Sequence, residues 1–173
     1  EQGLDIAIHS GILPSSSRIA KKIGECEWLL CASPDYLEKY GTPQQPKDLM
    51  NHRCFIFSFA SPWNKWAFIQ DGLGVTTPVK PRGSFTQGEL LRDMAKSGAG
   101  IVRLADFHIG KDIQEGSLVL LLDEYKAEIR EPIYLLYSDR KHLSPRIRVF
   151  IEFFHEKWIA HPWNVVRGLP EAT

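Results

Sequence analysis

The chain has 173 residues, of which 43% are hydrophobic and 24% are charged, and its 21 basic and 21 acidic residues give a formal net charge of zero. This composition is typical of a soluble globular protein, and the length suits one large domain or two small lobes. The balanced charge, with no run rich in lysine and arginine, excludes a bulk electrostatic attraction to nucleic acid or to a membrane. Three cysteines, an odd number, argue against a complete disulfide framework and favour a reducing cytoplasm.

The first half of the chain predicts strands, one capped helix and a hairpin. Mostly apolar residues over 4–10 and 27–33 predict two buried strands. Ser33 as cap, followed by Pro34, predicts a helix that Gly41 ends. A further strand is expected over 53–59, and the apolar stretches 65–70 and 74–80, on either side of a turn, predict a β-hairpin. The chain opens inside a strand pattern without methionine, so we expect a fragment of a longer protein.

The second half alternates helices and strands, which predicts an α/β fold. A helix is expected over 89–97, a strand over 100–104, a short helix over 105–116, and strands over 118–125 and 132–138. The last helix is expected to begin at Ser144-Pro145 and to carry one apolar stripe. The residues of that stripe are Ile147, Phe150, Ile151, Phe154 and Trp158, widened by Val149 and Phe153. The tail after His161 shows no periodicity, and we expect it to be loose.

Gly98-Ala99-Gly100 is the only glycine-rich element that could suggest a phosphate loop. It follows a helix and precedes a strand, whereas a dinucleotide loop needs a helix N-terminus facing the phosphate. Gly98 is better explained as a helix C-cap with positive φ. A nucleotide cofactor is therefore not predicted.

Catalytic and metal motifs are also missing from the sequence. There is no G-x-S-x-G elbow, no H-E-x-x-H pair and no cysteine–histidine spacing typical of zinc. Cys31 lies in an apolar run, which favours burial over nucleophilic reactivity. We expect no enzyme activity, no catalytic residues, no metal and no cofactor.

The start of the helix over 89–97 is the best candidate for a small-molecule site. Free backbone N–H groups at Thr86, Gln87 and Gly88, with the helix dipole, suit a carboxylate or another anion. The alternative is that Thr86 caps the helix and Glu89 completes a T-x-x-E capping box. Both roles are compatible, because the box does not use every donor.

The order of motifs resembles the effector-binding domain of LysR-type transcriptional regulators. That family's typical run is a strand D-x-A-I-R, a glycine, an L…S…ARRL stretch, and a strand leading into CASPxYL…G.P..P.DL..H.C. The matching positions are Asp5, Ala7, Ile8, Gly11, Leu13, Ser17, Ala20, Cys31, Ala32, Ser33, Pro34, Tyr36, Leu37, Gly41, Pro43, Pro46, Asp48, Leu49, His52 and Cys54. Later, "GELLRDMAKSGAGIVRLADF" and "LYSDRKHLSPRIRVFIEFF" are similar to further parts of the family pattern. The resemblance covers about residues 1 to 158.

The resemblance implies a type 2 periplasmic-binding-protein-like fold, in which two α/β lobes are joined by two crossover strands and bind an effector between them. It implies a first lobe over 1–32 and 132–160, incomplete at its N-terminal strand and helix, a second lobe over 33–131, and a C-terminal tail over 161–173. The winged helix-turn-helix that binds DNA is expected to be absent from this chain.

The implied effector-binding residues come from both lobes. They are His9, Ser10, Gly11, Phe57, Thr86, Gln87, Gly88, Leu104 and Ala105. His9 stands where arginine is common in the family, and Ala105 stands where proline is common. The implied partners are a small-molecule effector, further copies of the chain in a dimer or tetramer, and promoter DNA through the missing domain, in the cytoplasm and without a membrane. The alternative is a solute-binding protein of a transporter, which shares the fold.

Overall fold

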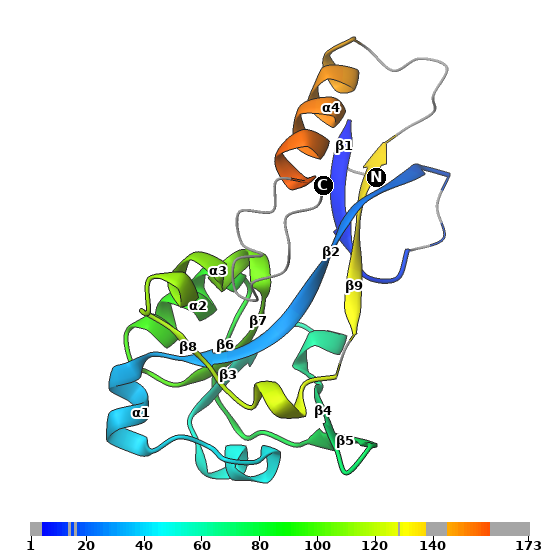
Figure 1. Ribbon diagram of the computed structural model, residues 1–173. Helices are drawn as coiled ribbons and strands as arrows, with labels where there is room; N and C mark the ends of the chain where they lie inside the picture. Colours follow the sequence, from blue (N-terminus) through cyan, green and yellow to red (C-terminus); the bar gives the residue numbers. More distant parts are fainter. Residues whose placement is uncertain (1–4, 14, 16, 128, 138–144, 160–173) are drawn as a thin grey trace. The chain divides into compact units, whose positions relative to one another are not determined.

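The computed structural model describes residues 5–13, 15, 17–127, 129–137 and 145–159 (Figure 1). These residues form two compact units, one within 5–27 and 130–159 and the other within 28–129. The chain passes from the first unit to the second inside strand β2 (Ile19–Ala32), between Glu27 and Trp28, and returns at Arg130. Both passages lie in or next to extended segments. The lobe boundaries that the sequence suggested stay a prediction.

The first unit contains an antiparallel arrangement of three strand segments. Strand β9 (Arg130–Tyr137) pairs with β1 (Ile6–Ser10) on one side and with the first part of β2 on the other. Tyr137 is opposite Ile6 in one pair and opposite Ile19 in the other. Helix α4 (Pro145–Ile159) follows in the chain.

The second unit is built on a mixed sheet in the order β2-β7-β3-β6. Its strands are the end of β2, β3 (Cys54–Phe57), β6 (Pro81–Phe85) and β7 (Ile101–Ala105), with the short β8 (Val119–Leu120) also paired to β2. Strands β3, β6 and β7 run parallel, whereas β7 and β8 are antiparallel to β2. Parallel strands of this kind are normally covered on both faces.

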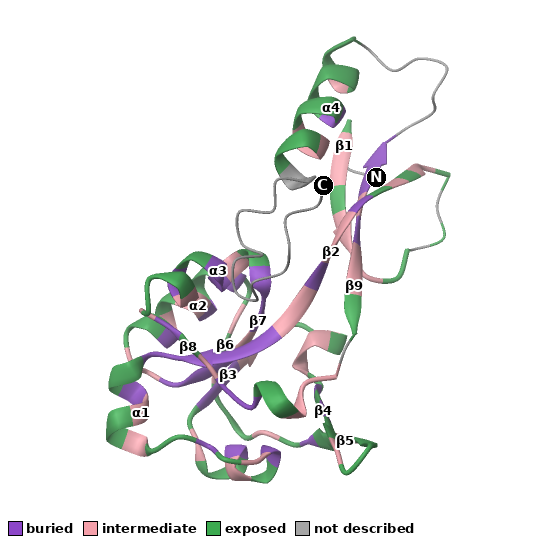
Figure 2. Cartoon of the chain, in the orientation of Figure 1, coloured by how far each residue is buried: buried purple, intermediate pink, exposed green. Residues whose placement is uncertain are grey.

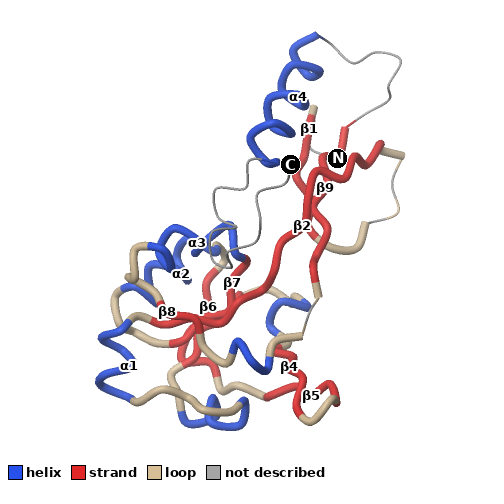
Figure 3. The backbone as a smooth tube through the Cα atoms, in the orientation of Figure 1, coloured by secondary structure: helices blue, strands red, loops and turns tan. Residues whose placement is uncertain are grey.

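Helices and a hairpin complete the second unit (Figure 3). The helices are α1 (Pro34–Tyr40), α2 (Gly88–Lys96) and α3 (Asp106–Gln114), with 3₁₀ turns at Pro46–Asn51, Pro62–Asn64 and Asp123–Tyr125. The predicted hairpin is confirmed as β4 (Trp66–Gln70) and β5 (Leu73–Thr77). Its turn has positive φ at Asp71 and at Gly72, as a tight two-residue hairpin loop requires.

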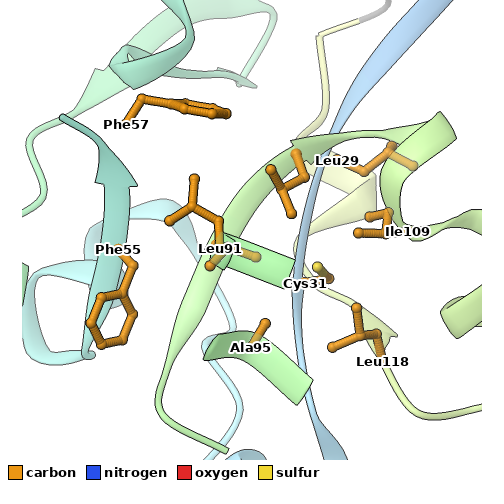
Figure 4. Packing of buried hydrophobic residues seen from close by; sticks show 10 residues of the cluster. Leu29, Cys31, Phe55, Phe57, Leu91, Ala95, Ile109 and Leu118 are labelled. Atoms are coloured by element: carbon orange, nitrogen blue, oxygen red, sulfur yellow. The ribbon is translucent and has the colours of Figure 1, made fainter. Parts of the chain in front are cut away.

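Two hydrophobic clusters form the core of the second unit, and alternate residues of β2 enter each of them. Leu29 and Cys31 pack with Leu91 of α2 and Ile109 of α3 (Figure 4). Leu30 belongs to the other cluster, which contains residues of α1 and the hairpin. Because successive side chains of a strand point to opposite faces, these clusters cover the two faces of the sheet. The purple strand segments in Figure 2 mark the buried residues.

The boundaries of α1 and the end of α2 agree with the predicted signals. The hydroxyl of Ser33 accepts a hydrogen bond from the backbone N–H of Tyr36, and α1 ends at Gly41. Gly98, with φ of 75°, stops α2, since its N–H donates to the carbonyl of Ala95. A second bond from Ala99 to Met94 completes a Schellman motif. The explanation of Gly98 as a C-cap is confirmed.

Tyr36 fixes α1 to the start of β3. Its buried hydroxyl is hydrogen-bonded to Nδ1 of His52 at 3.0 Å and accepts a hydrogen bond from the N–H of Arg53 at 3.0 Å. The guanidinium of Arg53 lies over the ring of Tyr40, 4.6 Å from its centre. Two positions that carry the family resemblance, Tyr36 and His52, therefore have a structural role.

The prediction of a strand over 118–125 is wrong for most of this range. Only Val119–Leu120 form a strand, and the chain then enters the 3₁₀ turn at Asp123–Tyr125. Leu122 adopts a left-handed conformation, with φ of 53°, which ends the extended run. The apolar run at this point reflects the burial of Leu121 and Leu122 in the core next to α1, and not a continuing strand.

The wide apolar stripe predicted for α4 is wrong in part. Ile151 is buried and Ile147 and Phe154 are half-buried, as expected. The other stripe residues with described side chains are exposed: Val149 by 63%, Phe150 by 43% and Phe153 by 56%. A run this rich in apolar residues has them on two faces of one helix, which helical spacing alone does not separate. The side chain of Trp158 and the tail after His161 lie outside the described residues.

Candidate functional site

Three parallel strands of the second unit end at one edge of the sheet. Phe57 at the end of β3 pairs with Phe85 at the end of β6, and β7 ends at Ala105. The N–H of Ser58 donates to the carbonyl of Phe85 at 2.9 Å, which holds the outgoing loops together. In α/β proteins this carboxyl edge is where ligands bind.

Helix α2 starts at this edge, directly after β6. Thr86 and Gln87 are exposed, and the structure gives their side chains no hydrogen bond within the described residues. Gly88, by contrast, is buried. The first backbone N–H groups of a helix have no partner in the helix itself, so they are available to an acceptor here.

The predicted capping box of Thr86 and Glu89 is wrong. The residue at the N-cap is Gln87, and no side chain caps the helix. Because the helix begins at Gly88 and not at Glu89, Glu89 occupies the second helical position, whereas a capping box requires the third. Of the two roles that the sequence left open for Thr86, capping is therefore removed.

Helix α3 starts at the same edge, after β7. Ala105 is its N-cap residue, and the carboxylate of the buried Asp106 accepts a hydrogen bond from the N–H of Phe107 at 2.8 Å. His108, in the first turn, lies against Gly88: a Cβ atom placed on that glycine would be 2.6 Å from Nε2 of the imidazole. Burial lowers the pKa of His108, while the nearby Glu89 raises it. The starts of both helices are thus in direct contact.

The three apolar candidates at this edge are parts of the core. Leu104 and Ala105 are fully buried, and Leu104 packs in the cluster that contains Leu29. Phe57 is also buried and makes edge contacts with Trp28 and Trp63. Their side chains support the edge from beneath, whereas Thr86 and Gln87 are exposed at it.

A buried carboxylate joins the two helices below the edge. Asp112 of α3 is fully buried and accepts hydrogen bonds from Arg92 and Lys96 of α2 and from Ser117. Burial alone raises the pKa of Asp112, but the bonds from Arg92 and Lys96 outweigh that effect and lower the pKa to about 2. Asp112 is therefore ionised and holds α2 and α3 together.

The first unit places its three candidates at the end of β1. The hydroxyl of Ser10 donates a hydrogen bond to Oε1 of Glu131. Gly11, with φ of 89°, donates from its N–H to the carbonyl of Pro132 at 2.9 Å, and His9 Nε2 donates to the carbonyl of Ile12 at 2.8 Å. The candidate residues of this unit are therefore neighbours, with a carboxylate beside them.

Sequence reasoning missed two residues that the structure adds to these sites. Glu131 lies beside Ser10 only because β1 and β9 pair antiparallel, with Ser10 opposite Ile133. His108 reaches Gly88 only because α2 and α3 pack side by side after two different strands. Neither contact leaves a spacing signal in the sequence, since the partners are 121 and 20 positions apart.

Cys26, Cys31 and Cys54 form no disulfide and are all buried, as expected for Cys31. Burial raises the pKa of Cys54 to about 12 and that of Cys31 further. Over the described ranges, the structure brings together no group of three or more histidine, cysteine, aspartate or glutamate side chains able to hold a metal ion. None of the helices described is long and apolar enough to cross a bilayer.

A mixed α/β chain in two units, which crosses between them twice and starts two helices at the carboxyl edge of parallel strands, has the features of a type 2 periplasmic-binding-protein-like domain. The family described as the LysR substrate binding domain matches residues 1–159, and the chain belongs to that family. The fold class predicted from the sequence is confirmed.

Individual relatives agree with this assignment. The HTH-type transcriptional regulator CrgA of Neisseria meningitidis serogroup B is 36% identical over 157 residues, which cover 91% of this chain and 52% of the relative. The HTH-type transcriptional activator AaeR of Escherichia coli K12 is 32% identical over 152 residues, covering 86% and 48%. The chain thus spans about half the length of the curated relatives it matches.

Solved structures give the same result. The regulatory domain of CrgA superimposes with a TM-score of 0.83 at 35% identity, covering 90% of this chain and 76% of that domain. Full-length AphB, a virulence activator of Vibrio cholerae, matches with a TM-score of 0.74 at 29% identity, covering 86% of this chain and 50% of that protein. The resemblance noted from the sequence is confirmed, and the homologues are transcriptional regulators.

Proposed function

We propose that this domain senses a small molecule that binds at the start of α2. Ser10 and Gly11 of the first unit are further candidates for effector binding in their own right. The observation that carries the proposal is the exposed, uncapped start of α2 at the carboxyl edge of three parallel strands. Free N–H groups and the hydroxyl of Thr86 suit a carboxylate or another anionic group.

The carboxylate of Glu131 beside Ser10 sharpens the expected chemistry of the effector. The negative charge beside Ser10 disfavours an anionic group there and favours a hydrogen-bond donor. An effector group that binds at Ser10 is therefore expected to be a hydroxyl or an amino group.

Within a longer protein, the effector would act by population shift. It alters the arrangement of lobes or subunits only if it binds one arrangement more tightly than the other. Through a DNA-binding domain outside this chain, that shift would change how a dimer or tetramer binds promoter DNA in the cytoplasm. Regulation without catalysis agrees with the names of the relatives, and a transporter solute-binding role is not favoured by them.

A thermal-shift panel tests the ligand proposal. Small acids with and without hydroxyl or amino groups, sulfate, cations and sugars are added to the chain, and a ligand specific for the folded state raises its melting temperature. We expect acids to raise it. A rise with cations or sugars and none with any acid would overturn the anion assignment. A gel-shift assay tests the regulatory role, and a full-length protein that binds no promoter DNA would contradict it.

A further inference from the structure

Among the histidines that the structure describes, His108 has its ring against the start of another helix at the candidate site. Nε2 of its imidazole lies so near Gly88 that a Cβ there would be at 2.6 Å, closer than real Cβ contacts. The centre of the His108 ring also lies 4.4 Å from the centre of the Phe107 ring, and only 19% of the His108 side chain is exposed. Only glycine at the first position of α2 lets the imidazole approach the backbone this closely.

An acidic group that acts on the imidazole is on the facing helix. Oε1 of Glu89 lies 3.8 Å from Nδ1 of His108, just beyond hydrogen-bonding distance, and the Glu89 side chain is 67% exposed. Arg92 is the other charged side chain of α2 that acts on the imidazole, but its guanidinium is bound by Asp112. The charged residues of α3 near His108 along the chain are Asp106, Lys111 and Asp112.

Protonation of His108 would favour a closer contact between its imidazole and Glu89. A buried imidazolium requires an anionic or hydrogen-bonding partner, because burial penalises its charge. Glu89 can supply that partner by closing the gap of 3.8 Å, and it belongs to the first turn of α2. The neutral ring, in contrast, packs against Gly88 without needing Glu89.

We propose that His108 is a proton-sensitive contact for the start of α2, so that acidification draws Glu89 onto the imidazole and alters the backbone around Gln87, Gly88 and Glu89. Its consequence for the effector rests on the function proposed above: a positive charge beside the start of α2 strengthens the binding of an anion there. The structural change itself needs no effector.

Nuclear magnetic resonance on the isotope-labelled chain without ligand tests the proposal, from about pH 8 to about pH 5. The imidazole of His108 is expected to titrate below its usual midpoint near 6.5. The backbone amides of Gln87 and Gly88 are expected to shift with the same midpoint. His108→Gln should abolish that shared transition. Amides that do not follow His108, or that keep their transition in the variant, would overturn the proposal.

Glu89→Gln supplies a second variant at an exposed position that leaves the core untouched. It removes the carboxylate that raises the pKa of His108, so the midpoint of His108 should move to lower pH. His52, whose ring is held by Tyr36, is the internal control and should not move. An unchanged His108 midpoint would contradict the proposal. This experiment also separates the proton-sensitive contact of His108 from the proposed binding of an acid, because a transition measured without ligand does not depend on whether any acid binds.

Discussion

Arg92 of α2 and Asp112 of α3 form a two-pronged ion pair in which Nε and Nη2 of the guanidinium donate to the two carboxylate oxygens, the second at 2.9 Å. Asp112 is fully buried, whereas Arg92 is 30% exposed. Bidentate pairs of this kind fix geometry as well as adding energy. The pair therefore sets how α2 lies against α3, the two helices that start at the candidate site.

Asp112→Asn should lower the free energy of unfolding by about 2 kcal/mol, because it leaves two cations without their buried partner. The loss is moderated because Arg92 and Lys96 are each about one-third exposed and can be hydrated. Denaturant unfolding checks the value. Lys111→Gln is the control, since its pair with Glu115 is on the surface and should contribute little. Equal stability of the two variants would contradict the role of Asp112.

The same carboxylate predicts an acid dependence of stability. Its pKa is lowered from 3.8 to about 2 on folding, so the unfolded chain binds a proton at higher pH than the folded one. The contribution of Asp112 is therefore fully present above about pH 4 and is lost as the pH falls through about 2. The difference in stability between the wild type and Asp112→Asn should shrink over this window. A difference that stays constant down to pH 2 would show that the carboxylate charge is not its source.

The sequence predicted the elements that depend on local signals and missed those that depend on distant contacts. Ser33, Pro34 and Gly98 define helix ends through the chemistry of a few neighbouring residues, so their roles were predictable. Strand β8 ends at Leu120, and Leu122, which follows it, is left-handed and buried in the core; a run of leucines carries no mark of either feature.

The candidate site was predictable to the same extent. The polar start of α2 was visible in the sequence, but a shift of one residue in its first turn removed the capping box of Thr86 and Glu89. The contacts of Glu131 with Ser10 and of His108 with Gly88 require strand register and helix packing, which spacing does not encode.

Gly100 should tolerate no side chain. A Cβ at this position would lie 2.2 Å from the carbonyl oxygen of Arg53, so the backbone between α2 and β7 would have to move. Gly100→Ala is expected to cost at least about 2 kcal/mol of unfolding free energy. Gly74→Ala is the matched control, because nothing lies within 4 Å of a Cβ there. Comparable melting temperatures for the two variants would contradict the close approach.

The three cysteines should be unreactive in the folded chain. Cys26, Cys31 and Cys54 are each at most 1% exposed, and the raised pKa of Cys54, about 12, keeps its thiolate scarce at neutral pH. A thiol reagent such as Ellman's reagent should detect almost no thiol in the native protein and all three after unfolding. Rapid reaction of a native thiol would show that the unit opens readily around β2 or β3.

The central claim is that the start of α2 binds the effector, and Thr86→Val tests it most directly. Thr86 is exposed and caps nothing, so valine should change the melting temperature of the free domain little. Isothermal titration with the acid that gives the largest thermal shift should then show roughly tenfold weaker binding in the variant, the loss expected for one hydrogen bond. Unchanged affinity in a stably folded variant would contradict the claim.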